Sequence, residues 1–169
     1  MAGGRELPIR VEETKGSDQI AVLVGTRDND NVDVSLRIFR LDIFDHHGVQ
    51  AQVIPISVGF WMGRFPFRTS SLSWSPDGKY LAFMPVFTSR NAFGSRIMLI
   101  RPDGSNQKTL VEGSWGLTGF TWSPDGRWIA FSTGFQLWAA SLDAFEKGTN
   151  PLVELAATAG VGLSWQNVN

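Results

Sequence analysis

Apolar and polar residues alternate along much of this chain, and the alternation is clearest in two segments that resemble each other. The first is LSWSPDGKYLAF, residues 72–83, and the second is FTWSPDGRWIAF, residues 120–131. In both segments, apolar residues alternate with small or polar ones before and after a shared Ser-Pro-Asp-Gly. Alternation with a period of two on both sides of a tight turn predicts a β-hairpin.

The shared Ser-Pro-Asp-Gly has the residues that a tight turn requires. Proline presets the backbone for the second turn position, and aspartate can accept hydrogen bonds from the nearby backbone. Glycine can adopt the left-handed conformation that closes the hairpin. Turn chemistry therefore explains the two aspartates better than a catalytic pair does. The predicted structural turn residues are Pro76, Asp77, Gly78, Pro124, Asp125 and Gly126.

Two further strands are predicted after each hairpin. Residues 96–113, RIMLIRPDGSNQKTLVEG, are expected to form a strand, a turn and a strand, and residues 135–155 have the same order with a longer turn. Trp74 and Trp122 occupy the same place in successive units and are expected to pack between them. A four-stranded unit that repeats every 40 to 50 residues or so is typical of a β-propeller blade, so we predict an all-β fold.

The two ends of the chain suggest an incomplete repeat at each end. Residues 19–26, 35–42 and 49–56 resemble the second, third and fourth strands of a blade, and VGLSWQNVN at the C-terminus resembles an innermost strand. Residues 1–16 have mixed charge and glycines, which predicts a flexible arm. The predicted propeller domain, 17–169, therefore has a first blade over 19–56 completed by 161–165, a second over 69–112 and a third over 117–156.

Three blades are fewer than a closed propeller usually needs, since closed rings have about four to eight. Open sheet edges and faces invite pairing with another chain. We therefore expect a homodimer in which two copies related by a two-fold axis close a six-bladed ring and exchange their last strands. The alternative is that the chain is a fragment of a longer propeller.

The repeated segments resemble the TolB-like propeller repeat family, a group of WD-like propellers. The resemblance rests on LSWSPDGKYLAF, FTWSPDGRWIAF and RIMLIRPDGSNQKTL, and it is most specific over residues 69–133. It implies a six-bladed fold in many members, and a role as an interaction platform or as the non-catalytic propeller beside a peptidase domain. Trp165 is followed by Gln-Asn, so the last repeat departs from the family's turn.

Composition narrows the function classes. The chain has 169 residues, of which 43% are hydrophobic and 18% charged, and a net charge of -1. No basic excess favours binding to a nucleic-acid backbone. The absence of cysteine excludes disulfides and thiolate chemistry. No apolar run approaches the length of about 20 residues that spans a bilayer, and no leader sequence is visible. We expect a cytoplasmic protein, or a periplasmic one if a leader was removed.

One inter-blade connection departs from the repeat. Residues 57–68, SVGFWMGRFPFR, are much longer than their counterparts near residues 112–116 and 158. Long loops rich in aromatic residues and arginine are common sites of partner binding, although this loop could also plug the central channel or lie at a subunit contact. The candidate partner-binding residues are Phe60, Trp61, Met62, Arg64, Phe65, Phe67 and Arg68.

Two polar clusters are weaker candidates for metal binding. The loop 26–35 contains Asp28, Asp30 and Asp33, but it lacks the glycine and the distant glutamate of an EF-hand calcium loop. His46 and His47 are adjacent in a predicted turn and would need a further ligand. No phosphate-binding or dinucleotide motif occurs. We therefore predict no metal and no cofactor.

The predicted innermost strands decide between the function classes. They are SLSWS, LTGFTWS and GLSW, which contain no acid and no histidine. We therefore expect a non-catalytic binding or scaffold module that recognises a protein or carbohydrate through the face bearing residues 57–68. The alternatives are a propeller hydrolase or lyase acting on a sugar or peptide in the channel, and a half-propeller fragment without independent activity.

Overall fold

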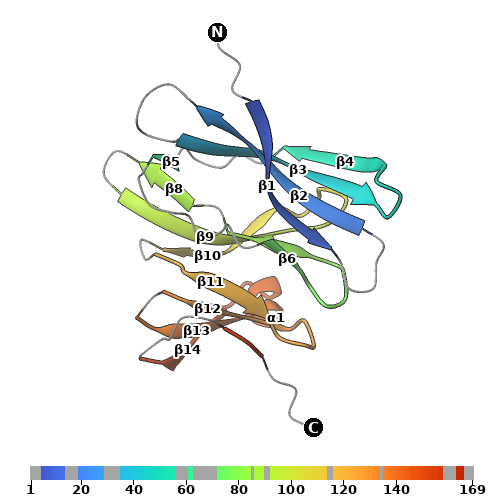
Figure 1. Ribbon diagram of the computed structural model, residues 1–169. Helices are drawn as coiled ribbons and strands as arrows, with labels where there is room; N and C mark the ends of the chain where they lie inside the picture. Colours follow the sequence, from blue (N-terminus) through green and yellow to red (C-terminus); the bar gives the residue numbers. More distant parts are fainter. Residues whose placement is uncertain are drawn as a thin grey trace.

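Three antiparallel sheets are stacked on one another in the computed structural model (Figure 1). The sheets follow the order of the chain, with the first and third at opposite ends of the stack. The structure describes these residues: 5–13, 19–28, 35–55, 61–62, 72–84, 86–89, 92–113, 116–133, 135–157 and 163–165. The sequence prediction of an all-β fold built from three four-stranded blades is confirmed at this level.

The first sheet, blade 1, has the order β1-β2-β3-β4. Its strands are β1 (Arg5–Glu13), β2 (Gln19–Asp28), β3 (Ser35–Asp45) and β4 (Gln50–Pro55). A short strand, β5 (Trp61–Met62), pairs with the start of β3.

The other two sheets repeat this arrangement. Blade 2 has the order β6-β7-β9-β10, with β6 (Leu72–Trp74), β7 (Leu81–Phe83), β9 (Ala92–Ile100) and β10 (Lys108–Gly113), and β8 (Val86–Ser89) pairs with β9. Blade 3 has the order β11-β12-β13-β14. Its elements are β11 (Gly119–Trp122), β12 (Trp128–Ser132), β13 (Leu137–Ser141), α1 (Leu142–Glu146) and β14 (Leu152–Ala156).

The two similar segments form the same hairpin. Leu72 pairs with Phe83 in blade 2, and Phe120 pairs with Phe131 at the same place in blade 3. Both phenylalanines after the turn are almost completely buried, at 1% and 0% exposure. Equivalent residues of the two repeats are thus buried alike, in strands whose consecutive residues point to opposite faces of the sheet and are buried on both.

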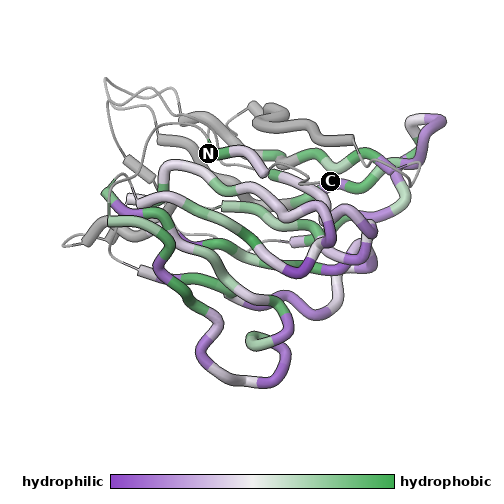
Figure 2. Tube along the Cα trace, turned by 90° about the horizontal axis from the view of Figure 1, so that it is seen from below, coloured by the Kyte–Doolittle hydropathy of each residue, from purple (hydrophilic) through white to green (hydrophobic). Residues whose placement is uncertain are grey.

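Two apolar clusters hold the stack together, one in each gap between sheets. The first joins blade 1, through residues such as Leu41 and Ile54, to Trp74 and Phe83 of blade 2. The second joins the opposite face of blade 2 to Ile129 and other residues of blade 3. Figure 2 shows hydrophobic colour along the strands and hydrophilic colour in the turns at their ends. Stability therefore comes from sheet-on-sheet burial.

The innermost strand of blade 1 corrects two predictions. Residues 5–13 were expected to belong to a flexible arm, but they form β1, which pairs with β2 along its whole length and contacts β6. β1 therefore fills the position that the sequence assigned to 161–165, and the predicted strand exchange at this edge is wrong. Leu7, Ile9 and Val11 alternate with polar residues, and this signal was obscured by Pro8, which lies at a register shift.

Residues 163–165, near the C-terminus, lie beside blade 3. The indole Nε1 of Trp165 donates a hydrogen bond to the carbonyl of Thr121, the residue before Trp122, at 3.2 Å. Trp122 makes the same contact one blade earlier, because its Nε1 donates to the carbonyl of Ser73 at 3.2 Å. Trp165 thus takes the place of a repeat tryptophan on the face of blade 3 that points away from blade 2.

Candidate functional site

The turns between strands bring blades 2 and 3 together around a pocket. A cavity of about 270 Å³ lies between the two blades. Blade 2 contributes Tyr80 from the hairpin of β6 and β7, the end of β9, the turn that follows it and the start of β10, and blade 3 contributes α1. Leu99, Leu142 and Phe145 supply the apolar part of the lining. The helix and the neighbouring turn therefore form the two walls of the pocket.

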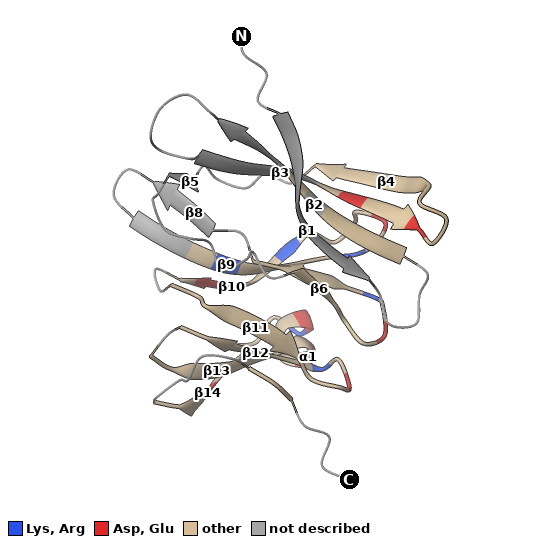
Figure 3. Ribbon diagram, viewed as in Figure 1, with Lys and Arg blue, Asp and Glu red and all other residues tan. Residues whose placement is uncertain are grey.

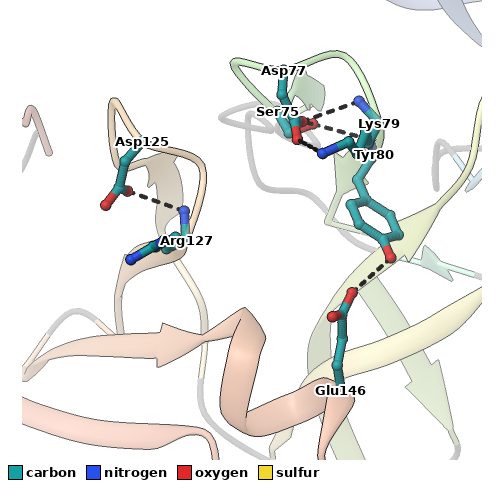
Figure 4. Close-up of polar contacts among 7 residues, drawn as sticks. All are labelled: Ser75, Asp77, Lys79, Tyr80, Asp125, Arg127 and Glu146. Carbon is teal, nitrogen blue, oxygen red and sulfur yellow. Dashed lines mark hydrogen bonds and ion pairs between the residues drawn. The ribbon is translucent and has the colours of Figure 1, made fainter.

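The polar part of the lining carries charges of both signs. The hydroxyl of Tyr80 donates a hydrogen bond across the blade interface to Oε1 of Glu146 at 2.9 Å (Figure 4). The guanidinium carbon of Arg101 lies 5.8 Å from the centre of the Tyr80 ring, and Nζ of Lys108 lies 5.8 Å from the centre of the Phe145 ring. Both distances fit cation–π contacts. The pocket therefore has two cations on the blade 2 side and one carboxylate on α1.

The turn that forms the blade 2 wall is held by its own hydrogen bonds. The amide of Gly104 donates to the carbonyl of Arg101 at 2.9 Å, and the amide of Ser105 donates to Oδ1 of Asp103 at 2.8 Å. Asn106, which also lines the pocket, has a positive φ of 57°. Asparagine adopts this conformation more readily than most other residues. The turn therefore holds Arg101 and Asn106 in the lining of the pocket.

The two Ser-Pro-Asp-Gly turns form matching hydrogen-bond networks, and Figure 4 shows the blade 2 network together with the contact between Asp125 and Arg127 of blade 3. In blade 2, the hydroxyl of Ser75 donates to Asp77 at 2.7 Å and accepts from the amide of Tyr80 at 2.9 Å. In blade 3, the hydroxyl of Ser123 donates to Asp125 at 2.6 Å and accepts from the amide of Trp128 at 2.9 Å. The structure places all six predicted turn residues in these two turns, where the blade 2 network positions Tyr80 at the pocket.

These networks lower the pKa of both aspartates. Partial burial opposes ionisation of Asp77, but hydrogen bonds from Ser75 and Lys79 outweigh it and hold the pKa below the usual value. Hydrogen bonds from the Ser123 side chain and the Arg127 backbone lower the pKa of Asp125. A lowered pKa fits a carboxylate used as an acceptor in a turn rather than as a proton donor.

The connection of residues 57–68 is described only at Trp61 and Met62, which form β5. Phe60, Arg64, Phe65, Phe67 and Arg68 lie outside the described residues. The backbone of β5 pairs with β3 of blade 1, away from the pocket between blades 2 and 3.

The weaker metal candidates are not brought together in the part of the chain that the structure describes. Asp28 ends β2, whereas Asp30 and Asp33 lie outside the described residues. His46 and His47 lie in an exposed turn with ring centres 3.7 Å apart. Among the described residues, no three His, Cys, Asp or Glu side chains are grouped so that they could hold a metal ion. Within the same ranges, no helix is long and apolar enough to cross a membrane.

Sequence reasoning missed the pocket because its residues come from four separate segments. One signal was available: the connection LDAFEKG is longer than the Pro-Asp-Gly turn at the same place in blade 2. The sequence predicted a longer turn there, whereas the structure has α1, capped by the Ser141 hydroxyl accepting from the amide of Ala144. Figure 3 shows charged residues on and beside α1, while the strands of blade 3 are mostly uncharged.

Comparison with solved structures establishes the fold class. Over 89% of its length the chain resembles the β-propeller domain of the trilobed protease from Pyrococcus furiosus, a propeller of open velcro topology, with a TM-score of 0.56 and 16% identity. It resembles the acylaminoacyl peptidase of Pyrococcus horikoshii (TM-score 0.53, 13% identity) and prolyl oligopeptidase B of Galerina marginata (TM-score 0.52, 13% identity), each also over 89% of the chain. The fold is therefore that of a β-propeller.

The chain spans less than half of each of these structures: 44% of the trilobed protease propeller, 25% of the acylaminoacyl peptidase and 22% of prolyl oligopeptidase B. No protein-family model matches the sequence, and no curated protein sequence matches it.

These findings correct the predicted function. The sequence favoured a non-catalytic binding scaffold, whereas the similar structures include propellers of peptidases. The sequence also placed no acid on the innermost strands, but the innermost strand of blade 1 is β1. That strand contains Glu6, Glu12 and Glu13, so the innermost strands are not free of acids.

Proposed function

We propose that this chain is the propeller part of a peptidase and receives peptide substrates. The supporting observation is its three-blade stack, which resembles propellers of three peptidases over most of the chain. Peptides are favoured over sugars among the substrates of a propeller hydrolase, because each of these similar proteins is a peptidase. The Trp-Ser-Pro-Asp-Gly turns also agree with a TolB-like origin of the repeat.

Our proposal includes closure of the ring by a second copy. Ala130 and Ala139 pair on the face of blade 3 that points away from blade 2, and Val153 continues this row with 46% of its surface exposed. The indole of Trp165 anchors to the same blade as the tryptophan of a following blade would. Val153 leaves an apolar surface exposed beside the two alanines, which are themselves buried at 7% and 3% exposure, and blade 1 of a second copy would cover it, since three blades are too few to close.

Peptide binding is tested by fluorescence anisotropy. The probes are fluorescein-labelled decapeptide libraries, one with free and one with amidated C-termini, and the matched control is labelled maltoheptaose. We expect saturable binding of at least one peptide library and none of the sugar. If neither peptide library binds, or if only the sugar does, the proposed substrate class is wrong.

Ring closure is tested by light scattering during size-exclusion chromatography. We expect twice the chain mass of 18.6 kDa for the unmodified protein. The substitution Val153→Lys should give the single chain mass, because it places a charge in the closing face. The control Val49→Lys changes a valine that is 61% exposed in the connection between β3 and β4, off the sheet face, and should leave the dimer intact. A folded monomer without any substitution would contradict the ring and leave peptide binding to be judged separately.

A further inference from the structure

The pocket between blades 2 and 3 exists where the repeat is broken. In blades 1 and 2, short turns join the third and fourth strands, and they are closed by hydrogen bonds such as Gly48 to Asp45 and Gly104 to Arg101. In blade 3 the same connection is α1, which brings Phe145 and Glu146 against blade 2. The pocket is thus built by an addition to the blade that the propeller architecture does not require.

The charges in the pocket are only partly compensated. Arg101 and Lys108 contact aromatic rings, and neither forms an ion pair with any residue that the structure describes, while Asp103 in the same turn interacts with Arg101 only electrostatically. Glu146 uses Oε1 to accept from Tyr80 and is itself exposed. An anionic group between the two cations would receive charge-assisted hydrogen bonds. A donor on the same ligand could reach Glu146 across the pocket.

The size and the floor of the pocket limit the ligand further. A volume of about 270 Å³ lies just below the range of about 300–1,000 Å³ for sites that bury drug-sized molecules. Phe145, which is partly exposed, offers apolar contact to a small side chain above the buried Leu99 and Leu142. The pocket therefore suits one amino-acid residue rather than an extended segment.

We propose that this pocket binds an apolar residue through its free carboxylate, with Arg101 and Lys108 as the carboxylate-binding residues. Resting on the proposed function, the ligand is the C-terminal residue of a peptide, whose backbone N–H can donate to Glu146. The same chemistry is present in a free N-acylated amino acid, and the experiment below separates these two sources.

The chain contains a single tyrosine, so Tyr80 reports on the pocket without overlap from other tyrosines. Protein labelled with ¹³C in tyrosine is titrated with N-acetyl-leucine and with its neutral control, N-acetyl-leucinamide, while the Tyr80 ring signals are followed by NMR. The pentapeptide Ala-Ala-Ala-Ala-Leu is then compared in its free-acid and amidated forms. We expect both acids to shift the signals and both amides to leave them unchanged.

The two possible ligands, a peptide C-terminus and a free N-acylated amino acid, predict different results. Binding of the peptide acid at least as tightly as N-acetyl-leucine supports the peptide C-terminus as the ligand. If N-acetyl-leucine binds and the peptide acid does not, the site is one for small free acids and its use for peptides is overturned. Equal shifts with acids and amides, or none with any compound, overturn the carboxylate site.

Substitutions in the pocket locate the binding groups. Arg101→Gln and Lys108→Gln should each weaken acid binding about fivefold to tenfold, because a charged hydrogen-bonding partner is lost. Lys147→Gln is the matched control: it removes the same charge just after α1, outside the pocket lining, and should leave the affinity unchanged. Unchanged affinity in the double variant Arg101→Gln/Lys108→Gln would overturn the assignment. If the pocket fails these tests while amidated peptide libraries still bind, the proposed function stands without it.

Discussion

The chain contains two internal resemblances, and they have opposite outcomes. Residues 72–83 and 120–131 form the same hairpin with matching turn networks. LDIFDHHG at 41–48 and LDAFEKG at 142–148 are also similar, but the first continues β3 into a turn whereas the second forms α1. A resemblance in sequence therefore predicted a common structure where the turn is closed by hydrogen bonds within the segment itself.

The two segments 41–48 and 142–148 are called the LD segments, after their shared Leu-Asp. The residue before each LD segment explains part of the difference between them. Ser141 caps α1 by accepting a hydrogen bond from the amide of Ala144. The corresponding residue in blade 1 is Arg40, whose side chain has no acceptor, and its backbone pairs instead with Pro55 of β4. In blade 3, the amide of Leu142 donates to the carbonyl of Arg127 in the Ser-Pro-Asp-Gly hairpin. Tertiary contacts thus fix the start of the helix.

The largest expected effect tests whether the two hairpins are equivalent in the core. Phe83→Ala and Phe131→Ala should each lower the free energy of unfolding by about 3–5 kcal/mol, because both rings are almost fully buried and leave a cavity. Urea unfolding measures both losses. If one loss of unfolding free energy is less than half of the other, the two repeats are packed differently despite their common register.

The second-largest loss of stability is expected at the glycines of the two Ser-Pro-Asp-Gly turns. Gly78 and Gly126 have positive φ values of 69° and 71°, so Gly78→Ala and Gly126→Ala should each cost about 1–2 kcal/mol of unfolding free energy. A Cβ at Gly126 would meet Pro76 only at an ordinary contact distance of 3.5 Å, so backbone strain accounts for the cost there. Thermal unfolding measures it. If only one of the two substitutions leaves the unfolding free energy unchanged, the two turns are not equivalent.

A smaller effect is expected from the helix cap. Ser141→Ala should lower the free energy of unfolding by about 1 kcal/mol, since the amide of Ala144 loses its acceptor. The reciprocal change Arg40→Ser should not convert the LD segment of blade 1 into a helix, because that segment is paired on both sides by β2 and β4. NMR chemical shifts of residues 41–45 and 142–146 check both statements. Helical shifts in 41–45 of Arg40→Ser would contradict the tertiary explanation.

The smallest effect concerns pH. The pKa values of Asp77 and Asp125 are lower in the folded protein than usual. The two ionised carboxylates therefore contribute their full stabilisation of the fold at pH values above the unfolded aspartate pKa of about 4. This stabilisation is lost as the pH falls through the folded values. The double variant Asp77→Asn/Asp125→Asn should therefore lose less stability than the unmodified protein when urea unfolding is repeated from pH 5 to pH 3. An identical loss in both proteins would show that the matching networks carry no electrostatic stabilisation.

The sequence predicted the repeated elements well and the pocket not at all. The Ser-Pro-Asp-Gly hairpins were predictable because the serine, proline, aspartate and glycine act within a few residues of one another. β1 was missed even though Leu7, Ile9 and Val11 alternate, because Pro8 and the mixed charge resemble a loop. The pocket was not predictable, since Tyr80, Arg101 and Glu146 become neighbours only when blade 3 packs on blade 2.

By itself, the sequence determined that the chain forms four-stranded antiparallel units, because side-chain alternation and turn chemistry are local properties. The tertiary structure alone decided which strand occupies the innermost position of blade 1 and which side chains meet between blades 2 and 3. These outcomes depend on competition among distant segments for the same sheet edge and the same buried face. No single segment carries the information that decides such a competition.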